Sequence, residues 1–218
     1  MNTTFLFEDD FEMAVDKQLK DLSFNTSRSI YIDLGELKSQ IDILAYKNGV
    51  LFCIECKSMI AWKMDFSRYR KTWVYLGDDG LERSMHSPYI QNKNHILVVE
   101  KYLSMQEGYN RWVNFYNEGL PIIQNICVFK NTLDLSELKN SSRVSTGVFR
   151  ISDLTLIDKL YKQKNKALAD LSQIAYNYLN NLSDISEEAK QKHKNYIYKC
   201  KKEKLGFFNP EAPCIITT

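Results

Sequence analysis

The sequence predicts an α/β domain with a mixed central β-sheet flanked by helices, and with further helices appended on its C-terminal side. Three observations support this class. The chain opens on a helical pattern, continues with several strand patterns around one long helical pattern, and returns to helical periodicity from residue 158 onward. A chain of 218 residues is long enough for one well-cored domain with a small appendage. We therefore expect a core over residues 1–157 and a helical extension over residues 158–218 that packs on it.

The elements of the first half follow from spacing and turn chemistry. Residues 8–22 predict a helix, because four apolar residues recur there at helical spacing. Acidic residues crowd what would be its first turn, where the helix dipole favours them. Strands are expected at residues 30–32, 73–76 and 81–85, and a hairpin at residues 40–57. Ser87 and Pro88 open a helix that runs to about residue 103, since proline suits a first turn.

The second half continues with strands and then helices. Residues 122–129 are an apolar run that suits a buried strand, and residues 147–151 predict another. Ser152 is expected to cap the helix that follows. From residue 158 one apolar stripe predicts a long helical stretch, and a second helix is expected from Ser186 through Lys204. These helices form the predicted extension.

Composition excludes several classes of protein. The formal net charge is only +2, so a nucleic-acid partner would have to be recognised through local charge. No apolar run approaches the roughly 20 residues of a membrane span, and Met1–Phe7 lacks the basic start of a signal peptide. The five cysteines, an odd number in a chain of this size, indicate free thiols in a reducing compartment. We expect a cytoplasmic protein with no membrane partner.

The hairpin carries an unusual set of charges. Asn48-Gly49 is a strong signal for a two-residue turn, because both positions accept positive φ. If Lys47 faces Val50, counting back puts Asp42 opposite Glu55, where Cβ atoms are about 4.5–5.5 Å apart and like charges repel. Lys57 follows Glu55 by two residues and shares its face. Two acids and a lysine in an apolar hairpin indicate a bound divalent cation. The alternative is a buried ion-pair cluster, which rarely stabilises a fold on balance.

This arrangement resembles a known family. Asp42 with Glu55-Cys56-Lys57 matches the D…E-x-K signature of the PD-(D/E)XK nuclease superfamily. Together with Ser87-Pro88-Tyr89-Ile90-Gln91 and the late strand Ile126–Phe129, it is similar to the nuclease-related domain, NERD, over residues 8–160. Two departures stand out: the acid follows Ile41 instead of proline, and Ser87 takes the place of the usual asparagine. The resemblance implies a restriction-endonuclease-like core.

The resemblance also implies an activity, the hydrolysis of phosphodiester bonds in DNA, with RNA left open. Asp42 and Glu55 suit Mg²⁺ or Mn²⁺, which prefer hard oxygen ligands. By resemblance, the backbone carbonyl of Cys56 completes the metal ligands, and Lys57 orients or deprotonates the attacking water or holds negative charge. A lysine that is partly desolvated near a dication can have a lowered pKa. Gln91 would bind near the phosphate or the lysine, and Gln40, opposite Lys57 in the predicted register, could steady it.

Several assignments stay open on sequence alone. The acid of the first helix is Glu12 or Glu8, of which Glu12 suits the family spacing better, although the helix dipole explains either. Four basic residues are either DNA contacts or part of an amphipathic surface segment: Lys63, Arg68, Arg70 and Lys71. His86 and His95 lack partners at zinc-ligand spacing. Rival functions are a catalytically inactive nucleic-acid-binding protein on a nuclease scaffold, or a subunit of a defence or repair assembly. A homodimer or a protein partner would use the C-terminal helices.

Overall fold

A mixed five-stranded sheet forms the centre of the protein, in the order β1-β2-β3-β7-β8. The computed structural model describes residues 3–182 except for 36, 62, 65–70, 78, 137–142 and 144–145. β1, β2 and β3 are antiparallel neighbours, and β7 and β8 continue the sheet parallel to β3. The strands of this sheet are β1 (Asn25–Asp33), β2 (Lys38–Lys47), β3 (Val50–Lys57), β7 (Ile123–Phe129) and β8 (Val148–Arg150).

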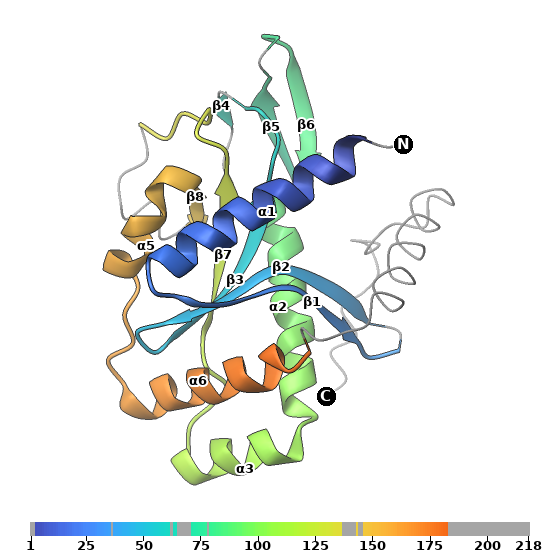
Figure 1. Ribbon diagram of the computed structural model, residues 1–218. Helices are drawn as coiled ribbons and strands as arrows, with labels where there is room; N and C mark the ends of the chain where they lie inside the picture. Colours follow the sequence, from blue (N-terminus) through green and yellow to red (C-terminus); the bar gives the residue numbers. More distant parts are fainter. Residues whose placement is uncertain are drawn as a thin grey trace. The chain divides into compact units, whose positions relative to one another are not determined.

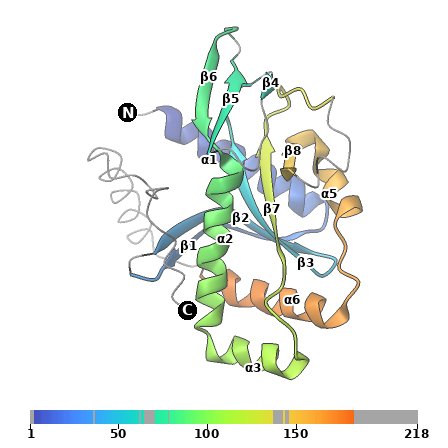
Figure 2. The ribbon, with the colours of Figure 1, turned by 180° about the vertical axis from the view of Figure 1, so that it is seen from behind.

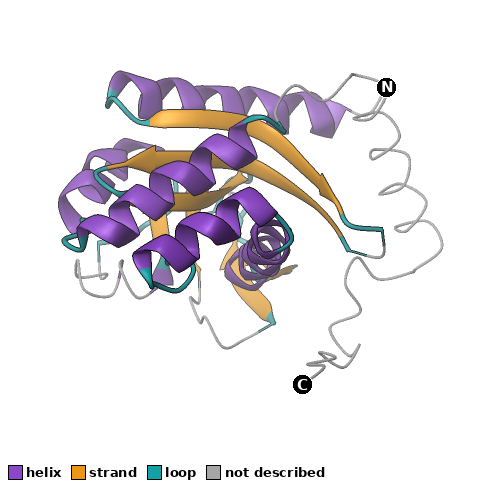
Figure 3. Ribbon diagram, turned by 90° about the horizontal axis from the view of Figure 1, so that it is seen from below, coloured by secondary structure: helices purple, strands orange, loops and turns teal. Residues whose placement is uncertain are grey.

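Helices cover both faces of this sheet (Figures 1, 2 and 3). One face packs on α1 (Thr3–Asp21) and α5 (Leu154–Leu160), which follows the short η1 (Ile151–Asp153). The other face packs on α2 (Pro88–Ser104) and α6 (Lys166–Asn180), and α3 (Glu107–Tyr116) packs against these two helices. A separate antiparallel sheet consists of β4 (Lys63–Met64), β5 (Thr72–Leu76) and β6 (Glu82–His86). The predicted α/β class with a mixed, helix-flanked sheet is confirmed.

The central strand β3 is buried on both faces, which explains its nearly continuous apolar sequence. Phe52 and Ile54 join the core beneath α1, while Leu51 and Cys53 join the core beneath α2. Glu55 is therefore a carboxylate inside a strand that is otherwise buried and apolar.

The turn between β2 and β3 has the predicted geometry. Asn48 has φ +52° and Gly49 has φ +78°, as a turn with two left-handed residues requires. Lys47 pairs with Val50, and the ladder continues back to Ile43 and Ile54. The predicted register of the hairpin is confirmed over these five pairs.

Some helix boundaries differ from the prediction. α1 begins at Thr3, so no acidic residue lies in its first turn. Ser152 lies inside η1 and does not cap α5, whose N-cap residue is Asp153. The helical stretch breaks after Leu160, because Tyr161 turns extended and packs its ring edge-on to Phe52. The helix expected between Ser186 and Lys204 lies outside the described residues.

Two further elements bear on the organisation of the chain. α3 was not expected, because exposed aromatic residues interrupt the polar side of its sequence. α6 begins at Asn165, whose side chain accepts from the Leu168 amide at 3.2 Å, and it contacts β1, β2 and β3. It thus belongs with the sheet in a compact unit, Met1–Ser183. Within the described chain, every helix is too short or too polar to cross a membrane.

Candidate active site

The predicted site lies where β2 and β3 separate. Their ladder ends at Ile43 and Ile54, after which β2 stays paired with β1 and β3 with β7. Asp42 and Glu55 are the next residues beyond this last pair. Gln40 pairs with Tyr31 on β1, so the predicted pairing of Gln40 with Lys57 across the hairpin is wrong. The separation opens the sheet at the position of the two acids.

Asp42 is hydrogen-bonded to β3, although the ladder between β2 and β3 has already ended at this point. Its Oδ2 accepts a hydrogen bond of 2.8 Å from the backbone N–H of Cys56. The strand also rotates here, since Ile41 packs in the core beneath α2 and Ile43 packs in the core beneath α1. The rotation and the hydrogen bond together hold the Asp42 carboxylate beside the segment that carries Glu55 and Lys57.

Glu55 and Lys57 form a close ion pair, as the pleat of β3 predicts for residues two apart. The Lys57 Nζ lies 2.5 Å from Oε1 of Glu55, and the Glu55 side chain is only 2 % exposed. Gln91 on α2 contributes its Oε1 to the same ammonium group at 3.3 Å. Three of the predicted site residues therefore meet around the Lys57 Nζ.

Helix α2 is positioned by buried amide groups. Asn92 is fully buried and donates to the carbonyl oxygens of Cys53 on β3, at 2.7 Å, and Ile126 on β7, at 3.1 Å. The helix starts as predicted, with Pro88 in its first turn and the Ser87 hydroxyl accepting from the Ile90 amide at 3.3 Å. Gln91 is the residue next to Asn92. The anchored helix therefore holds the side-chain amide of Gln91 at the site.

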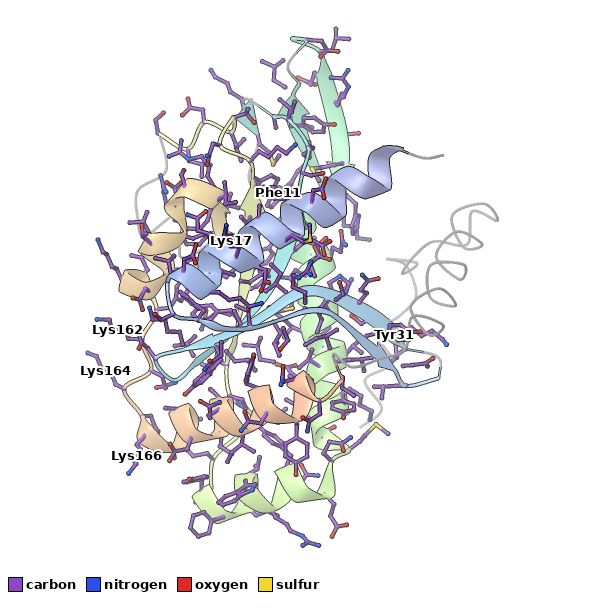
Figure 4. All side chains as sticks on the ribbon, viewed as in Figure 1. Phe11, Lys17, Tyr31, Lys162, Lys164 and Lys166 are labelled. Atoms are coloured by element: carbon purple, nitrogen blue, oxygen red, sulfur yellow. The ribbon has the colours of Figure 1, made fainter. Side chains whose placement is uncertain are left out.

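Glu12 reaches the site from α1. Its neighbours Phe11 and Val15 are buried in the core beneath α1, and Phe11 marks this part of the helix in Figure 4. Burial raises the pKa of Asp42 most, the charges of Glu55 and then Glu12 raise it further, and Lys57 opposes them. Glu12 lies beyond the first turn of α1, so the helix dipole does not account for it. The side chain of Glu8 lies outside the described residues.

The buried charges act on one another strongly. Burial would raise the pKa of Glu55, but Lys57 and His95 outweigh it and lower the pKa from 4.5 to about 2. Burial would lower the pKa of Lys57, but Glu55 and Asp42 outweigh it and raise the pKa above its usual value. In the metal-free site Lys57 is therefore an ammonium group at neutral pH, and a lowered pKa beside a bound dication stays a prediction.

The predicted DNA-contacting residues are only partly described. Lys63 is exposed in β4, across from Leu76 on β5. Lys71 is exposed just before β5, and its carbonyl oxygen accepts from the Ser87 amide at 2.7 Å, next to the start of α2. Burial and then the charges of Lys57 and Lys71 lower the pKa of His86. Arg68 and Arg70 lie outside the described residues.

Sequence reasoning missed His95 and Ser39. His95 follows Gln91 by one helical turn, and its Nε2 lies 3.5 Å from Oε2 of Glu55. Its Nδ1 lies 2.6 Å from the Ser39 hydroxyl, and both residues are buried. The four-residue spacing from Gln91 was the available signal, because it puts both side chains on one face of a helix.

Other charged residues lie elsewhere. Lys162, Lys164 and Lys166 point outward (Figure 4), and Gln163 among them donates its backbone N–H to Asn48 at the turn of the hairpin, at 3.4 Å. At about 3.3 Å per residue, this turn lies roughly 20 Å along β3 from Glu55. Within the described ranges, no three His, Cys, Asp or Glu side chains are grouped so that they could hold a metal ion.

A comparison with protein families identifies one match. The family model described as nuclease-related domain covers residues 8–130. This range contains Glu12, Asp42, Glu55, Lys57 and Gln91, and also His95. A comparison with curated proteins finds no match.

Proposed function

Because the chain belongs to the nuclease-related domain family, we propose that it is a metal-dependent nuclease that hydrolyses phosphodiester bonds in DNA through a PD-(D/E)XK site. One observation carries this proposal: Asp42, Glu55 and Lys57 gather where two strands separate, and α2 adds Gln91 to them. A purely structural ion-pair cluster is a poorer explanation. Among the described residues, Asp42, Glu12 and Glu55 face the ammonium group of Lys57 and the ring of His95, and buried carboxylates in such excess are costly without a further cation.

In this proposal Asp42, Glu55 and the backbone carbonyl of Cys56 hold Mg²⁺ or Mn²⁺. The donor set fits, because these cations take hard oxygen ligands and usually one or two carboxylates. The raised pKa of Asp42 supports it, since burial and neighbouring acids disfavour its charge until a cation balances them. When bound, the ion acts as a Lewis acid on the phosphate and lowers the pKa of its water.

Lys57 serves this site as a cation. Its ammonium group donates hydrogen bonds, so it orients the attacking water and holds negative charge that develops on the phosphate. Gln91 and Glu55 fix the position of its Nζ from two elements, α2 and β3. Glu12 adds negative charge from α1, which favours the binding of a cation next to Asp42.

We propose that the substrate binds on the side of the site where β4, β5 and β6 lie. Lys63 and Lys71 are exposed there and contact phosphates in this proposal, together with Arg68 and Arg70. Phosphate contacts of this kind position the nucleic acid without reading its sequence. The affinity for DNA should therefore fall as salt rises.

Plasmid cleavage tests the proposal. Supercoiled plasmid is incubated with the protein and Mg²⁺ or Mn²⁺, with and without EDTA, and nicked and linear products are measured. We expect cleavage that EDTA abolishes and that Asp42→Asn, Glu55→Gln and Lys57→Ala each reduce roughly 100-fold or more. Lys164→Ala, at the turn end of the hairpin, is the control and should cleave like the wild type. Binding of DNA or RNA without cleavage under either metal would contradict the proposal and favour the non-catalytic binder.

A further inference from the structure

We propose that His95, oriented by Ser39, is a positioning residue that fixes the second carboxylate oxygen of Glu55. This inference rests on the proposed function, in which Glu55 is a metal ligand. Lys57 holds Oε1 of Glu55 at 2.5 Å, and the Nε2 of His95 faces Oε2 from the other side at 3.5 Å. The carboxylate is thereby held by two cationic or polar groups, one from its own strand and one from α2.

The strongest support comes from two buried atoms that lack other partners. Among the described residues, Oε2 of Glu55 and Nε2 of His95 are both fully shielded from solvent, and neither makes a hydrogen bond within the usual distance limit. They lie within ion-pair distance of each other. Because an unsatisfied buried polar atom destabilises a fold, each of these two atoms is placed to serve as the partner of the other.

The hydrogen-bonding partners of His95 indicate which nitrogen of its imidazole ring carries the hydrogen that faces Glu55. An ionised carboxylate only accepts hydrogen bonds, so the Nε2 of His95 must carry the hydrogen that faces Glu55. The Nδ1 of the ring then faces the Ser39 hydroxyl, 2.6 Å away, which can donate to a bare Nδ1 or accept from a protonated one. Ser39 on β2 and His95 on α2 thus form a chain of contacts that ends at Glu55.

The packing of α2 holds this series of contacts, from Ser39 through His95 to Glu55, in a fixed position. Asn92 ties the helix to β3 and β7 through two buried carbonyl groups, and His95 lies less than one turn further along. Gln91 contacts Lys57 from the same helix face. One helix therefore positions both partners of the ion pair, the lysine through Gln91 and the glutamate through His95. Outer partners of this kind typically change metal affinity about 10–100-fold when they are removed.

Two substitutions of His95 separate positioning from packing. His95→Gln keeps an N–H donor near the place of Nε2 and therefore keeps the contact with Glu55. His95→Asn keeps a polar group near Nδ1, next to Ser39, and loses the donor that faces Glu55. Leu97→Asn introduces the same asparagine at an exposed position of the same helix and is the matched control. The affinity for Mn²⁺ is measured without nucleic acid by electron paramagnetic resonance, and thermal melts check folding.

We expect His95→Asn to bind Mn²⁺ about 10–100-fold more weakly than the wild type, and His95→Gln and Leu97→Asn to stay within about threefold of it. Equal weakening by His95→Gln and His95→Asn, or wild-type affinity in a folded His95→Asn, would overturn the proposal, because a merely structural histidine predicts one of these results.

Imidazole nitrogen spectra of ¹⁵N-histidine-labelled protein provide a second measurement that needs neither metal nor activity. The signals of His95 are those that disappear in His95→Gln. We expect the hydrogen on Nε2 and a shift of this signal in Glu55→Gln. A hydrogen on Nδ1 with none on Nε2, or no response to Glu55→Gln, would overturn the proposal. If the wild-type protein binds no Mn²⁺, the proposed function fails, and these spectra alone decide the contact between His95 and Glu55.

Discussion

The backbone amide of Cys56 donates a hydrogen bond of 2.8 Å to Oδ2 of Asp42, across the point where β2 and β3 separate. This contact replaces the ladder pair that the hairpin would otherwise make at this position. It holds a carboxylate next to a second carboxylate, Glu55, in a buried strand. The arrangement costs stability in the absence of a cation, and this cost leads to the first prediction.

Asp42→Asn should stabilise the metal-free protein while it abolishes cleavage. The asparagine carbonyl still accepts from the Cys56 amide, but the repulsion from Glu55 and Glu12 is gone. We expect the free energy of unfolding in EDTA at neutral pH to rise by about 0.5–2 kcal/mol, as measured by urea unfolding. Asp158→Asn, which removes a carboxylate that is paired with Lys47 at 2.9 Å, should have the opposite effect. A less stable Asp42→Asn protein would contradict this prediction.

The gain from Asp42→Asn should also depend on pH. The pKa of Asp42 is higher in the folded protein than its ordinary value of 3.8, so the wild-type protein loses stability as pH rises above 3.8, and the loss levels off once pH passes the folded pKa. The variant lacks this loss, and the difference between the two free energies of unfolding should grow with pH and then level off. Urea unfolding in EDTA from about pH 4 to about pH 9 measures it. A difference that is constant over this range would contradict the assignment.

Asn92→Ala should destabilise the protein by about 2–3 kcal/mol, because it leaves buried carbonyl groups on β3 and β7 without their donor. Asn92 is fully buried, whereas Lys93 beside it is exposed. Lys93→Ala is the control and should change the free energy of unfolding by no more than about 0.5 kcal/mol. Equal effects of the two substitutions in urea unfolding would show that Asn92 does not hold α2.

Gly49→Ala should destabilise the protein more than Gly80→Ala. Both glycines have positive φ, +78° and +74°, so both substitutions strain the backbone. A Cβ at Gly49 would lie 2.5 Å from the Ala169 Cβ on α6, whereas a Cβ at Gly80 meets nothing within 4 Å. We expect about 1 kcal/mol for Gly80→Ala and about 2–3 kcal/mol for Gly49→Ala in urea unfolding. Equal losses would mean that α6 yields to the added methyl group.

Glu12→Gln should reduce cleavage at least about tenfold, while Glu8→Gln should have little effect. The charge of Glu12 raises the pKa of Asp42, which favours Glu12 as the helix acid of the site. The loss should shrink at high Mg²⁺ if Glu12 favours the binding of the cation. The measurement is the plasmid-cleavage rate of both variants over a series of Mg²⁺ concentrations. The reverse order of the two variants would reassign the helix acid to Glu8.

The parts of the site that lie on one hairpin were predictable. Turn chemistry at Asn48 and Gly49 specifies the register, and the pleat of a strand puts Glu55 and Lys57 on one face. The helix start at Pro88 and the contact from Gln91 also followed from local signals. The predicted place of Gln40 opposite Lys57 was wrong, because the ladder between β2 and β3 ends at Ile43 and Ile54 and does not reach these residues. The register near a turn does not predict where the two strands separate, because that point depends on the pairing of β2 with β1 and of β3 with β7.

By itself, then, the sequence determined the class of the fold, the hairpin and the order of the residues around Asp42, Glu55 and Lys57, because short-range sterics and periodicity act within a few residues. Only the tertiary structure decided that Ser39 and His95 join them, and that the charge of Glu12, which the family resemblance suggested, acts on Asp42. These three residues come from β2, α2 and α1, and they approach Glu55 and Asp42 because the helices bury their apolar faces on the two sides of the sheet. The same packing keeps Lys57 charged, since a buried carboxylate 2.5 Å away outweighs the desolvation of its ammonium group.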